Sequence, residues 1–315
     1  MTSKAKILVY SNPKVTLGVC VRNCEDLIRA AIDSIINQDY PHEFMEVIFV
    51  DDGSEDKTLS ILKSYVPEMK MSTEIFHQEW KGLGPARNVV LNKTNGKYIL
   101  WVDGDMVLSK DFVRKQVMFM EKNPSVGIGK GRYGMYIQAN LLETLENMEF
   151  VATNFRRRGK TDSTPLGTGG SIYRVEAIRQ VGGFDQNITG SGEDHDAEYR
   201  VRAAGWLLDI TSAVFYERRR KTWKSLWNEY FWHGRSGPYL LGKNKRILNL
   251  YKFWPPVAFT IEFSRIARAY KLTRRKTALL LPLHYAFKRT AWLLGFLKSL
   301  LKNGDNKRKP SGGNG

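Results

Sequence analysis

Cysteine is scarce in this 315-residue sequence, which contains only Cys20 and Cys24. Two cysteines cannot supply the disulfide framework of a small secreted protein, and they have no companions at zinc-binding spacing. We therefore expect both to be core residues in a reducing compartment. Residues 1–13 also lack an apolar run followed by a small-residue cleavage site, so the sequence predicts no signal peptide.

Long apolar runs are missing as well. In the last third, the longest uncharged run extends from Thr277 to Phe287, which is 11 residues. A membrane-spanning helix needs roughly 20, and Lys288 and Arg289 interrupt the apolar stretch directly afterwards. The sequence thus predicts no transmembrane helix, although its 42% hydrophobic content is sufficient for a large core.

Acidic residues are scarce in one part of the chain only. Residues 1–213 hold 26 Lys and Arg against 28 Asp and Glu, whereas residues 214–315 hold 23 against 4, a net charge of +19. So basic a segment suits nucleic acid, an anionic membrane surface or a polyanionic substrate. Its aromatic and aliphatic residues favour a pair of interfacial helices that direct Lys and Arg toward anionic lipid headgroups. The alternative is that these helices pack on the rest of the chain or on a second subunit.

The first half of the sequence alternates two hydrophobic periods. Short runs rich in Val and Ile, which end at charged or turn-forming residues, predict strands. Apolar residues at helical spacing predict a helix after each of the first two strands, with Ser54 as the N-cap of the second helix. This alternation is typical of a mostly parallel α/β sheet with helices on both faces. The predicted strands are 15–21, 46–52, 72–78 and 97–103, and the predicted helices are 25–38 and 54–66.

Two acidic clusters follow predicted strands. Asp51 and Asp52 end the second strand, and Asp103 and Asp105 flank Gly104 after the fourth. Ligands of open α/β sheets bind at the carboxyl ends of strands, so both clusters should face one crevice. A surface turn would also explain an Asp-Gly-Asp sequence, but paired carboxylates at such a place suit Mg²⁺ or Mn²⁺ together with substrate phosphates. Neither a G-x-G-x-x-G sequence nor a P-loop is present, which argues against a nicotinamide site and a P-loop nucleotide site.

Four sequence blocks resemble, in order and spacing, the family 2 glycosyltransferases with a GT-A fold. They are the region from VTLGVCVRNCEDL to FVDDGSEDKT, then GPARN, WVDGDM and GEDHDAEYRVRAAGW, and the resemblance covers residues 15–220. It implies the inverting transfer of a sugar from a nucleoside diphosphate sugar to a lipid-linked or cell-surface glycan acceptor. UDP is the first choice of nucleotide and GDP the second. The implied cofactor is Mn²⁺ or Mg²⁺.

The resemblance also assigns roles to residues. Asp105 is the implied direct metal ligand, and Asp103 would contact the ribose or the metal's waters. Asp52, with Asp51 beside it, matches the position that recognises the nucleobase. The full set implied in nucleotide binding is Arg22, Asn23, Asp51, Asp52, Arg87, Asp103 and Gly104.

Asp194 matches the catalytic base of the family, with Glu193 beside it. The like charges of Glu193, Asp194 and Asp196 are expected to raise the pKa of a carboxylate here toward a useful range, whereas a bound metal would oppose this rise. Asp196 and Glu198, farther along the same helix, are interpreted as solvated surface charges. The glycine-rich segment before this helix is implied to line the donor and acceptor cleft, where the residues expected are Gly169, Gly170 and Ser171.

One position departs from the family. Many relatives have a metal-binding histidine in the strand after the Glu-Asp helix, whereas this sequence has Tyr216. The metal could then have fewer protein ligands, or His233 could approach from the following segment. We favour a structural or acceptor-facing role for His233.

The sequence thus divides into a GT-A catalytic domain (1–220), a basic, aromatic-rich helical region (221–302) and a disordered tail (303–315). The expected location is the cytoplasmic face of the cell membrane, with peripheral attachment, and an oligomer is possible. A sugar-phosphate nucleotidyltransferase is the rival enzyme, but no glycine-rich basic loop lies near the N-terminus. A nucleic-acid-binding protein would leave the aspartates of the motifs without a role, so no nucleic-acid partner is expected.

Overall fold

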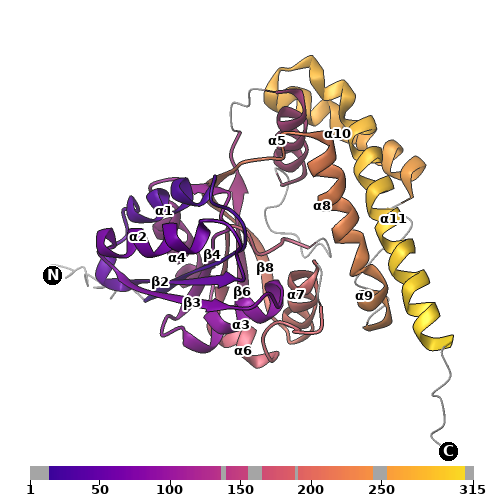
Figure 1. Ribbon diagram of the computed structural model, residues 1–315. Coiled ribbons are helices and arrows are strands. Elements are labelled where there is room, and N and C mark those ends of the chain that lie inside the picture. The colour runs from indigo at the N-terminus through magenta and orange to yellow at the C-terminus, as the bar shows by residue number, and fades with distance from the viewer. Residues whose placement is uncertain (1–13, 136–139, 155–164, 189–190, 244–253, 309–315) are drawn as a thin grey trace, which may run out of the picture.

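An eight-stranded sheet of order β3-β2-β1-β4-β7-β6-β8-β5 organises the first two thirds of the chain (Figure 1). The computed structural model describes residues 14–135, 140–154, 165–188, 191–243 and 254–308. The strands are β1 (Val15–Val21), β2 (Met45–Asp52), β3 (Ser72–Gln78), β4 (Tyr98–Trp101), β5 (Met106–Leu108), β6 (Val126–Tyr133), β7 (Ser171–Arg174) and β8 (Leu207–Glu217).

The half of the sheet formed by β1 to β4 is parallel. β1 pairs with β2 from Val15 opposite Met45 to Val21 opposite Asp51, and it pairs with β4 on its other side. These strands confirm the prediction of a parallel α/β sheet. In the other half, β7 runs antiparallel to β4 and β6, and β5 runs antiparallel to β8, while β6 and β8 are parallel. The whole sheet is therefore mixed.

Helices cover both faces of the sheet. Successive side chains of a strand point to opposite faces, so Leu17 and Val19 of β1 enter one hydrophobic core and Cys20 enters the other. Cys24 is half-buried at the edge of the first core. The first core is covered by α1 (Ile28–Ile36), α2 (Thr58–Tyr65) and α4 (Phe112–Lys122), and the second by α3 (Leu83–Lys93), α6 (Val175–Gln180) and α7 (Glu193–Ala203).

The helix predicted over 54–66 begins four residues later, at Thr58, so the prediction of Ser54 as its N-cap was wrong. The side chains that resemble caps are used by the loop before the helix. Ser54 Oγ accepts a hydrogen bond from the Asn23 backbone N–H at 3.0 Å, and Asp56 Oδ2 accepts one from the Glu25 N–H at 3.1 Å. The loop after β2 is thereby fastened to the loop after β1.

The C-terminal helices form a layer beside the sheet (Figure 1). α11 packs along α8 and α10, and α10 also packs on α5. α8 and α11 approach closely, because a Cβ on Gly234 would overlap the Trp292 carbonyl oxygen and one on Gly295 would overlap that of Phe231. The helices of this layer are α5 (Leu141–Asn154), α8 (Trp223–Arg235), α9 (Gly237–Lys243), α10 (Pro255–Thr273), the 3-10 helix η4 (Lys276–Leu280) and α11 (Leu281–Arg308).

Two expectations about the last third need correction. α11 continues to Arg308, so residues 303–308 of the predicted disordered tail are helical, and residues 309–315 lie outside the described residues. Lys288, expected to face lipid headgroups, is fully buried. Its Nζ donates to Glu146 Oε1 at 2.6 Å and to Glu149 Oε2 at 2.8 Å, so two carboxylates of α5 replace the expected solvent contact.

Within the described ranges, no helix combines the length and hydropathy needed to cross a bilayer.

Candidate active site

A cavity of about 590 Å³ lies between the carboxyl-terminal edge of the sheet and the C-terminal helices. On the sheet side its lining includes Asp103, Asp105, Lys130, Asp194 and Glu217. On the helical side α5, α8, α10 and α11 contribute Glu146, Glu149, Phe150, Tyr230, His233, Arg265, Tyr285 and Arg289. The cavity therefore joins the acidic motifs of the first two thirds to the basic, aromatic last third.

Asp103 and Asp105 lie on the turn between β4 and β5. The turn is held by the residue that follows β8, because the Arg218 backbone N–H donates to the Asp105 carbonyl oxygen at 2.9 Å. Burial raises the pKa of the Asp105 carboxyl well above its usual range, and the like charges of Glu217 and Asp103 raise it further. Asp103, Asp105 and Glu217 line one cavity, and carboxylate oxygens are the hard donors that Mg²⁺ and Mn²⁺ prefer, so these residue types suit a divalent cation. Their oxygens are not drawn together, because the one group of three ligand atoms within 4.8 Å among the described residues is that of Glu146, Glu149 and His284.

Glu217 is a residue of this site that the sequence motifs did not reveal. It is the last residue of β8 and pairs in register with Met106, next to Asp105. Its pKa is raised by burial and by the nearby Asp103, against the opposing charge of Arg219, whose Nη1 lies 2.5 Å from Glu217 Oε1. The sequence did contain a signal for Glu217. Successive residues of a strand point to opposite faces, so if Tyr216 points away from the cavity, the acid that follows it points toward the cavity.

Tyr216 itself does not line the cavity. Its ring lies against Gly134, where a Cβ would overlap it. His233, on α8, does line the cavity together with Asp194, and burial lowers its pKa. The carboxylate of Glu217, rather than the ring at position 216, thus occupies the cavity side of the β8 end.

Arg87 and Glu193 form a buried ion pair between α3 and the first turn of α7. The guanidinium also lies over the rings of Trp101 and Phe184, with 5.9 and 5.7 Å to the ring centroids. Both charged residues line the cavity. Because Glu193 is neutralised by Arg87, it is a poorer candidate for a base than its neighbour.

Asp194 is the more accessible carboxylate of the Glu-Asp pair. Its Oδ1 accepts the His195 backbone N–H at 2.8 Å, and its side chain is 19% exposed. Burial alone would raise the pKa of Asp194, but the charges of His195, Arg87 and Lys130 and the hydrogen bond from His195 lower it overall. The expected upward shift was therefore wrong, because cations outweigh the neighbouring carboxylates.

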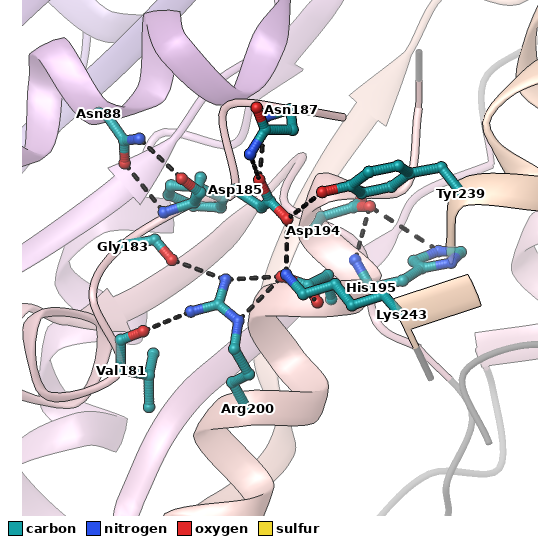
Figure 2. Close-up of polar contacts among 12 residues, drawn as sticks. Asn88, Val181, Gly183, Asp185, Asn187, Asp194, His195, Arg200, Tyr239 and Lys243 are labelled. Atoms are coloured by element: carbon teal, nitrogen blue, oxygen red, sulfur yellow. Dashed lines mark hydrogen bonds and ion pairs between the residues drawn. The ribbon is translucent and has the colours of Figure 1, made fainter. Parts of the chain in front are cut away.

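Asp196 and Glu198 are buried and bonded, so their interpretation as solvated charges was wrong. Figure 2 shows the network around α7, in which Arg200 donates to Asp196 and to the carbonyl oxygens of Val181 and Gly183. Lys243 of α9 bridges Asp196 at 2.8 Å and Asp185 at 2.6 Å. This network fixes the helix that carries Asp194.

The glycine-rich segment lies between the two acidic sites. Gly169 lines the cavity, and a Cβ there would overlap Asp103 Oδ2. Glu198 accepts the Gly167 backbone N–H at 2.6 Å. Gly170 and Ser171 do not line the cavity: Gly170 lies against the ring of Phe215, and Ser171 is buried, with its Oγ donating to the Gly167 carbonyl oxygen.

Asp51 and Asp52 are buried at the end of β2 and are not part of the cavity lining. Asp52 holds the connection to α3, because it accepts hydrogen bonds from the backbone N–H groups of Lys81 and Gly82 at 3.0 and 2.8 Å. Asp51 Oδ2 lies 2.7 Å from His77 Nδ1, while its buried Oδ1 has no hydrogen-bond partner among the described residues.

Arg22 and Asn23 follow β1 and lie outside the cavity lining. Arg22 pairs with Glu55 at 3.0 Å and lies over the Trp80 ring, whereas Asn23 adopts a left-handed φ of 50° and accepts the Glu55 N–H. Gly104 brings the Asp-Gly-Asp turn against this region, since a Cβ there would lie 3.0 Å from Cys24 Sγ.

Comparison with known proteins agrees with this architecture. The sequence profile of glycosyl transferase family 2 matches residues 16–182. The glycosyltransferase GlyA of Streptococcus pneumoniae serotype 4 is 36% identical over 233 residues, which is 70% of this chain and 33% of GlyA. The probable glycosyltransferase YdaM of Bacillus subtilis is 26% identical over 242 residues, 73% of this chain and 57% of YdaM. The chain thus spans between a third and three fifths of these relatives.

Solved structures show the same fold at low sequence identity. The mannosyltransferase PcManGT from Pyrobaculum calidifontis, in complex with GDP-Man and Mn²⁺, superposes with a TM-score of 0.64 at 18% identity, covering 93% of this chain and 88% of that one. Residues 1–349 of TarS from S. aureus, in complex with UDP-GlcNAc, superpose with a TM-score of 0.51 at 18% identity, covering 92% of each chain.

The chain therefore belongs to glycosyl transferase family 2, and its α/β sheet with flanking helices is a GT-A glycosyltransferase fold.

Proposed function

We propose that this chain transfers a sugar, with inversion, from a nucleoside diphosphate sugar to an acceptor hydroxyl. The arrangement that supports this most is the meeting of Asp103, Asp105 and Asp194 in one cavity. The similar TarS structures hold UDP or UDP-GlcNAc, and PcManGT holds GDP-Man. A UDP-sugar is accordingly the first choice of donor here and a GDP-sugar the second.

In this proposal Asp105 and Asp103 hold Mn²⁺ or Mg²⁺. Glu217 is the further carboxylate for this cation, at the strand end where many relatives have a histidine. When bound, the cation neutralises the charge that develops on the leaving diphosphate. The raised pKa of Asp105 agrees with such a role, because a cation between the carboxylates would remove their mutual repulsion.

Asp194 is the proposed general base. Its Oδ1 is engaged by the His195 N–H, and its Oδ2 faces Gly167 at the cavity wall. Oδ2 would accept the proton of the acceptor hydroxyl as that oxygen attacks the anomeric carbon from the face opposite the diphosphate. The bond to the diphosphate breaks as the new glycosidic bond forms, which inverts the configuration. The Arg87–Glu193 ion pair keeps the first turn of α7 in place for this step.

The acceptor would enter along the helical wall of the cavity. Phe150, Tyr230, Trp232 and Tyr285 line this wall, and aromatic rings supply flat apolar surface together with polar tips that suit a sugar. A lipid-linked or cell-surface glycan is the acceptor class we propose. We therefore propose that residues 1–220 form the catalytic domain, which binds the donor, and that residues 221–302 complete the wall of the cavity along which the acceptor binds.

A membrane surface would bring such an acceptor to the cavity. Leu283, Leu294, Leu297 and Leu301 share one face of α11 at helical spacing, opposite the buried Trp292, and Leu279 of η4 precedes them. These five leucines, which we call the leucine face, are 43% to 72% exposed. Exposed cations accompany them: Arg274, Arg275, Lys276 and Lys298. We propose peripheral attachment to the cytoplasmic face of the cell membrane through this face.

A hydrolysis screen tests the proposed function. UDP- and GDP-sugars are incubated with the protein and Mn²⁺, and released nucleotide is read. We expect metal-dependent release from one donor, and we expect Asp105→Ala to abolish it while the circular dichroism spectrum is unchanged. Asp33→Ala, on the exposed side of α1, is the matched control. If calorimetric titration of the nucleoside diphosphate showed the same metal-dependent affinity in Asp105→Ala, Asp105 would not belong to the site.

A further inference from the structure

Lys130 is a buried cation at the centre of β6 that the proposed chemistry does not place in contact with donor or acceptor. It is 1% exposed, although it lines the cavity, and it lies in register with Ser171 of β7 and Ile210 of β8. Its Nζ donates to the carbonyl oxygen of Gly169 and, at 3.4 Å, to that of Gly167.

The surroundings of this ammonium are anionic on two sides. Asp103 and Glu217 on the metal side, and Asp194 and Glu198 on the base side, all favour its charged form, while burial lowers its pKa. The rings of Tyr133 and Phe215 lie 5.2 and 5.4 Å from Nζ. Without this ammonium, the carbonyl oxygens of Gly167 and Gly169 would lose their donor, and the four surrounding carboxylates would lose its compensating charge. The cation itself is therefore needed at this place.

The two carbonyl groups that Lys130 binds belong to a turn that touches both acidic sites. At Gly167, a Cβ would lie 3.6 Å from Asp194 Oδ2 and 3.8 Å from Lys130 Nζ. At Gly169, a Cβ would overlap Asp103 Oδ2. The turn is closed by the Ser171 N–H, which donates to the Thr168 carbonyl oxygen at 2.7 Å.

We propose that Lys130 is a positioning residue for glycosyl transfer: its ammonium holds the Gly167–Gly169 turn at a fixed place between Asp103 and Asp194. This inference rests on the proposed function for its catalytic consequence. Lys130 neither takes a proton nor contacts the reacting atoms. It sets the spacing between the carboxylate that meets the donor and the carboxylate that meets the acceptor, so its loss should affect kcat more than donor affinity.

The test compares Lys130→Met, which keeps the length and removes the charge, with Lys122→Met at the exposed end of α4 as the control. Three quantities are measured on the full chain: kcat with the donor that the screen identifies, affinity for its nucleoside diphosphate, and amide hydrogen exchange of residues 166–171. We expect Lys130→Met to lower kcat at least tenfold, to change nucleotide affinity less than threefold, and to speed exchange in residues 166–171 only.

Chemical rescue separates the cation from general structural support. In Lys130→Ala, ethylammonium should restore part of kcat and slow the exchange of residues 166–171, whereas tetramethylammonium at equal ionic strength should not.

Two results would overturn the inference. One is wild-type kcat together with wild-type exchange in Lys130→Met. The other is loss of kcat with faster exchange throughout the sheet and no rescue. If Lys130→Met does not fold, Lys130→Gln takes its place with the same readouts. Exchange is measured without turnover. A wild-type chain inactive on every donor would therefore refute the proposed function, while exchange in residues 166–171 would still decide whether Lys130 holds the turn.

Discussion

The residues that surround Asp194 determine its charge state. Arg87 approaches from α3, Lys130 from β6 and His195 from the same helix, and together they lower its pKa against the effect of burial. The like charge of Glu198 and the imidazole of His233 are also near. A base of lowered pKa is weaker but fully ionised at neutral pH, so every molecule would begin the reaction with the proton acceptor ready.

Asp194→Asn should keep donor binding and lose transfer by about 10² to 10⁴-fold, the usual contribution of a general base. Donor affinity and transfer rate are measured on one preparation, with Asp33→Asn as the control on exposed α1. Because the pKa of Asp194 is lowered, its protonation should not limit the wild-type rate between about pH 8 and about pH 5. A loss below about tenfold, short of that range, would assign the proton to another acceptor.

At the residue scale, some residues that the motifs imply line the cavity and others do not. Those outside its lining are Arg22, Asn23, Asp51, Asp52, Gly104, Gly170 and Ser171. Asp103, Asp105 and Asp194 were recognised from their blocks, and all three line the cavity. Glu217 was missed because its role depends on which side of β8 faces the cavity, and that is decided by packing. Asp196 resembles a surface charge in the sequence, yet Lys243, which neutralises it, lies 47 positions farther along the chain.

The helices α5 and α11 are joined by a buried polar cluster made of Glu146, Glu149, His284 and Lys288. The ligand-capable atoms of the two glutamates and the histidine all lie within 4.8 Å of one another, and Lys288 Nζ binds both glutamates. The lysine ammonium therefore fills the place that a metal ion could otherwise take. Burial alone would raise the pKa of Glu146, but the Lys288 charge and the hydrogen bond with His284 lower it to about 2.

Lys288→Met should destabilise the helical layer strongly. Removal of one partner from a buried ion pair typically costs about 3 to 5 kcal/mol, because the remaining charge is left uncompensated. Urea unfolding followed by circular dichroism measures the change, and Lys298→Met, an exposed residue of the same helix, is the control. Equal unfolding midpoints for the two variants would show that Glu146 and Glu149 do not depend on Lys288.

Among the elements, the four strands and two helices predicted over residues 15–103 agree with the structure to within about three residues at most ends, because their apolar periods are regular. The start of α2 was the exception, since its capping residues serve a loop contact. The other elements of the first half, such as α3, α4 and β6, were not predicted. The sequence predicted helices in the last third but placed Lys288 on the wrong side. The hydrophobic period of a sequence indicates a helix and its apolar face. It does not show that a lysine such as Lys288 is buried on that face, because the glutamates that neutralise it lie in a distant helix, α5.

For the molecule as a whole, the leucine face and the net charge of +19 beyond residue 213 predict binding to an anionic bilayer. Liposome flotation should show binding that increases with anionic lipid and weakens at high salt, since surface charges are screened. Leu283→Gln with Leu297→Gln should reduce it, whereas Leu207→Gln, an exposed leucine of β8, should not.

Protease added to one side should find no protected C-terminal fragment, because no described helix is long and apolar enough to cross. Equal binding to neutral and anionic vesicles would contradict the electrostatic part of this proposal. A C-terminus reached only from the far side would contradict its geometry.

The walls of the cavity come from two parts of the chain, and this has a consequence for chimaeras that combine segments of related proteins. The family profile ends at residue 182, whereas Tyr230, His233, Tyr285 and Arg289 come from the last third. A chimaera that received another relative's last third would keep Asp103 and Asp105 and gain a new opposite wall. Under the proposed function, changes of acceptor preference could therefore accumulate in the last third while the residues proposed for donor binding stay unchanged. This requires that contacts such as Lys243 with Asp196 and Lys288 with Glu146 are kept as matched pairs.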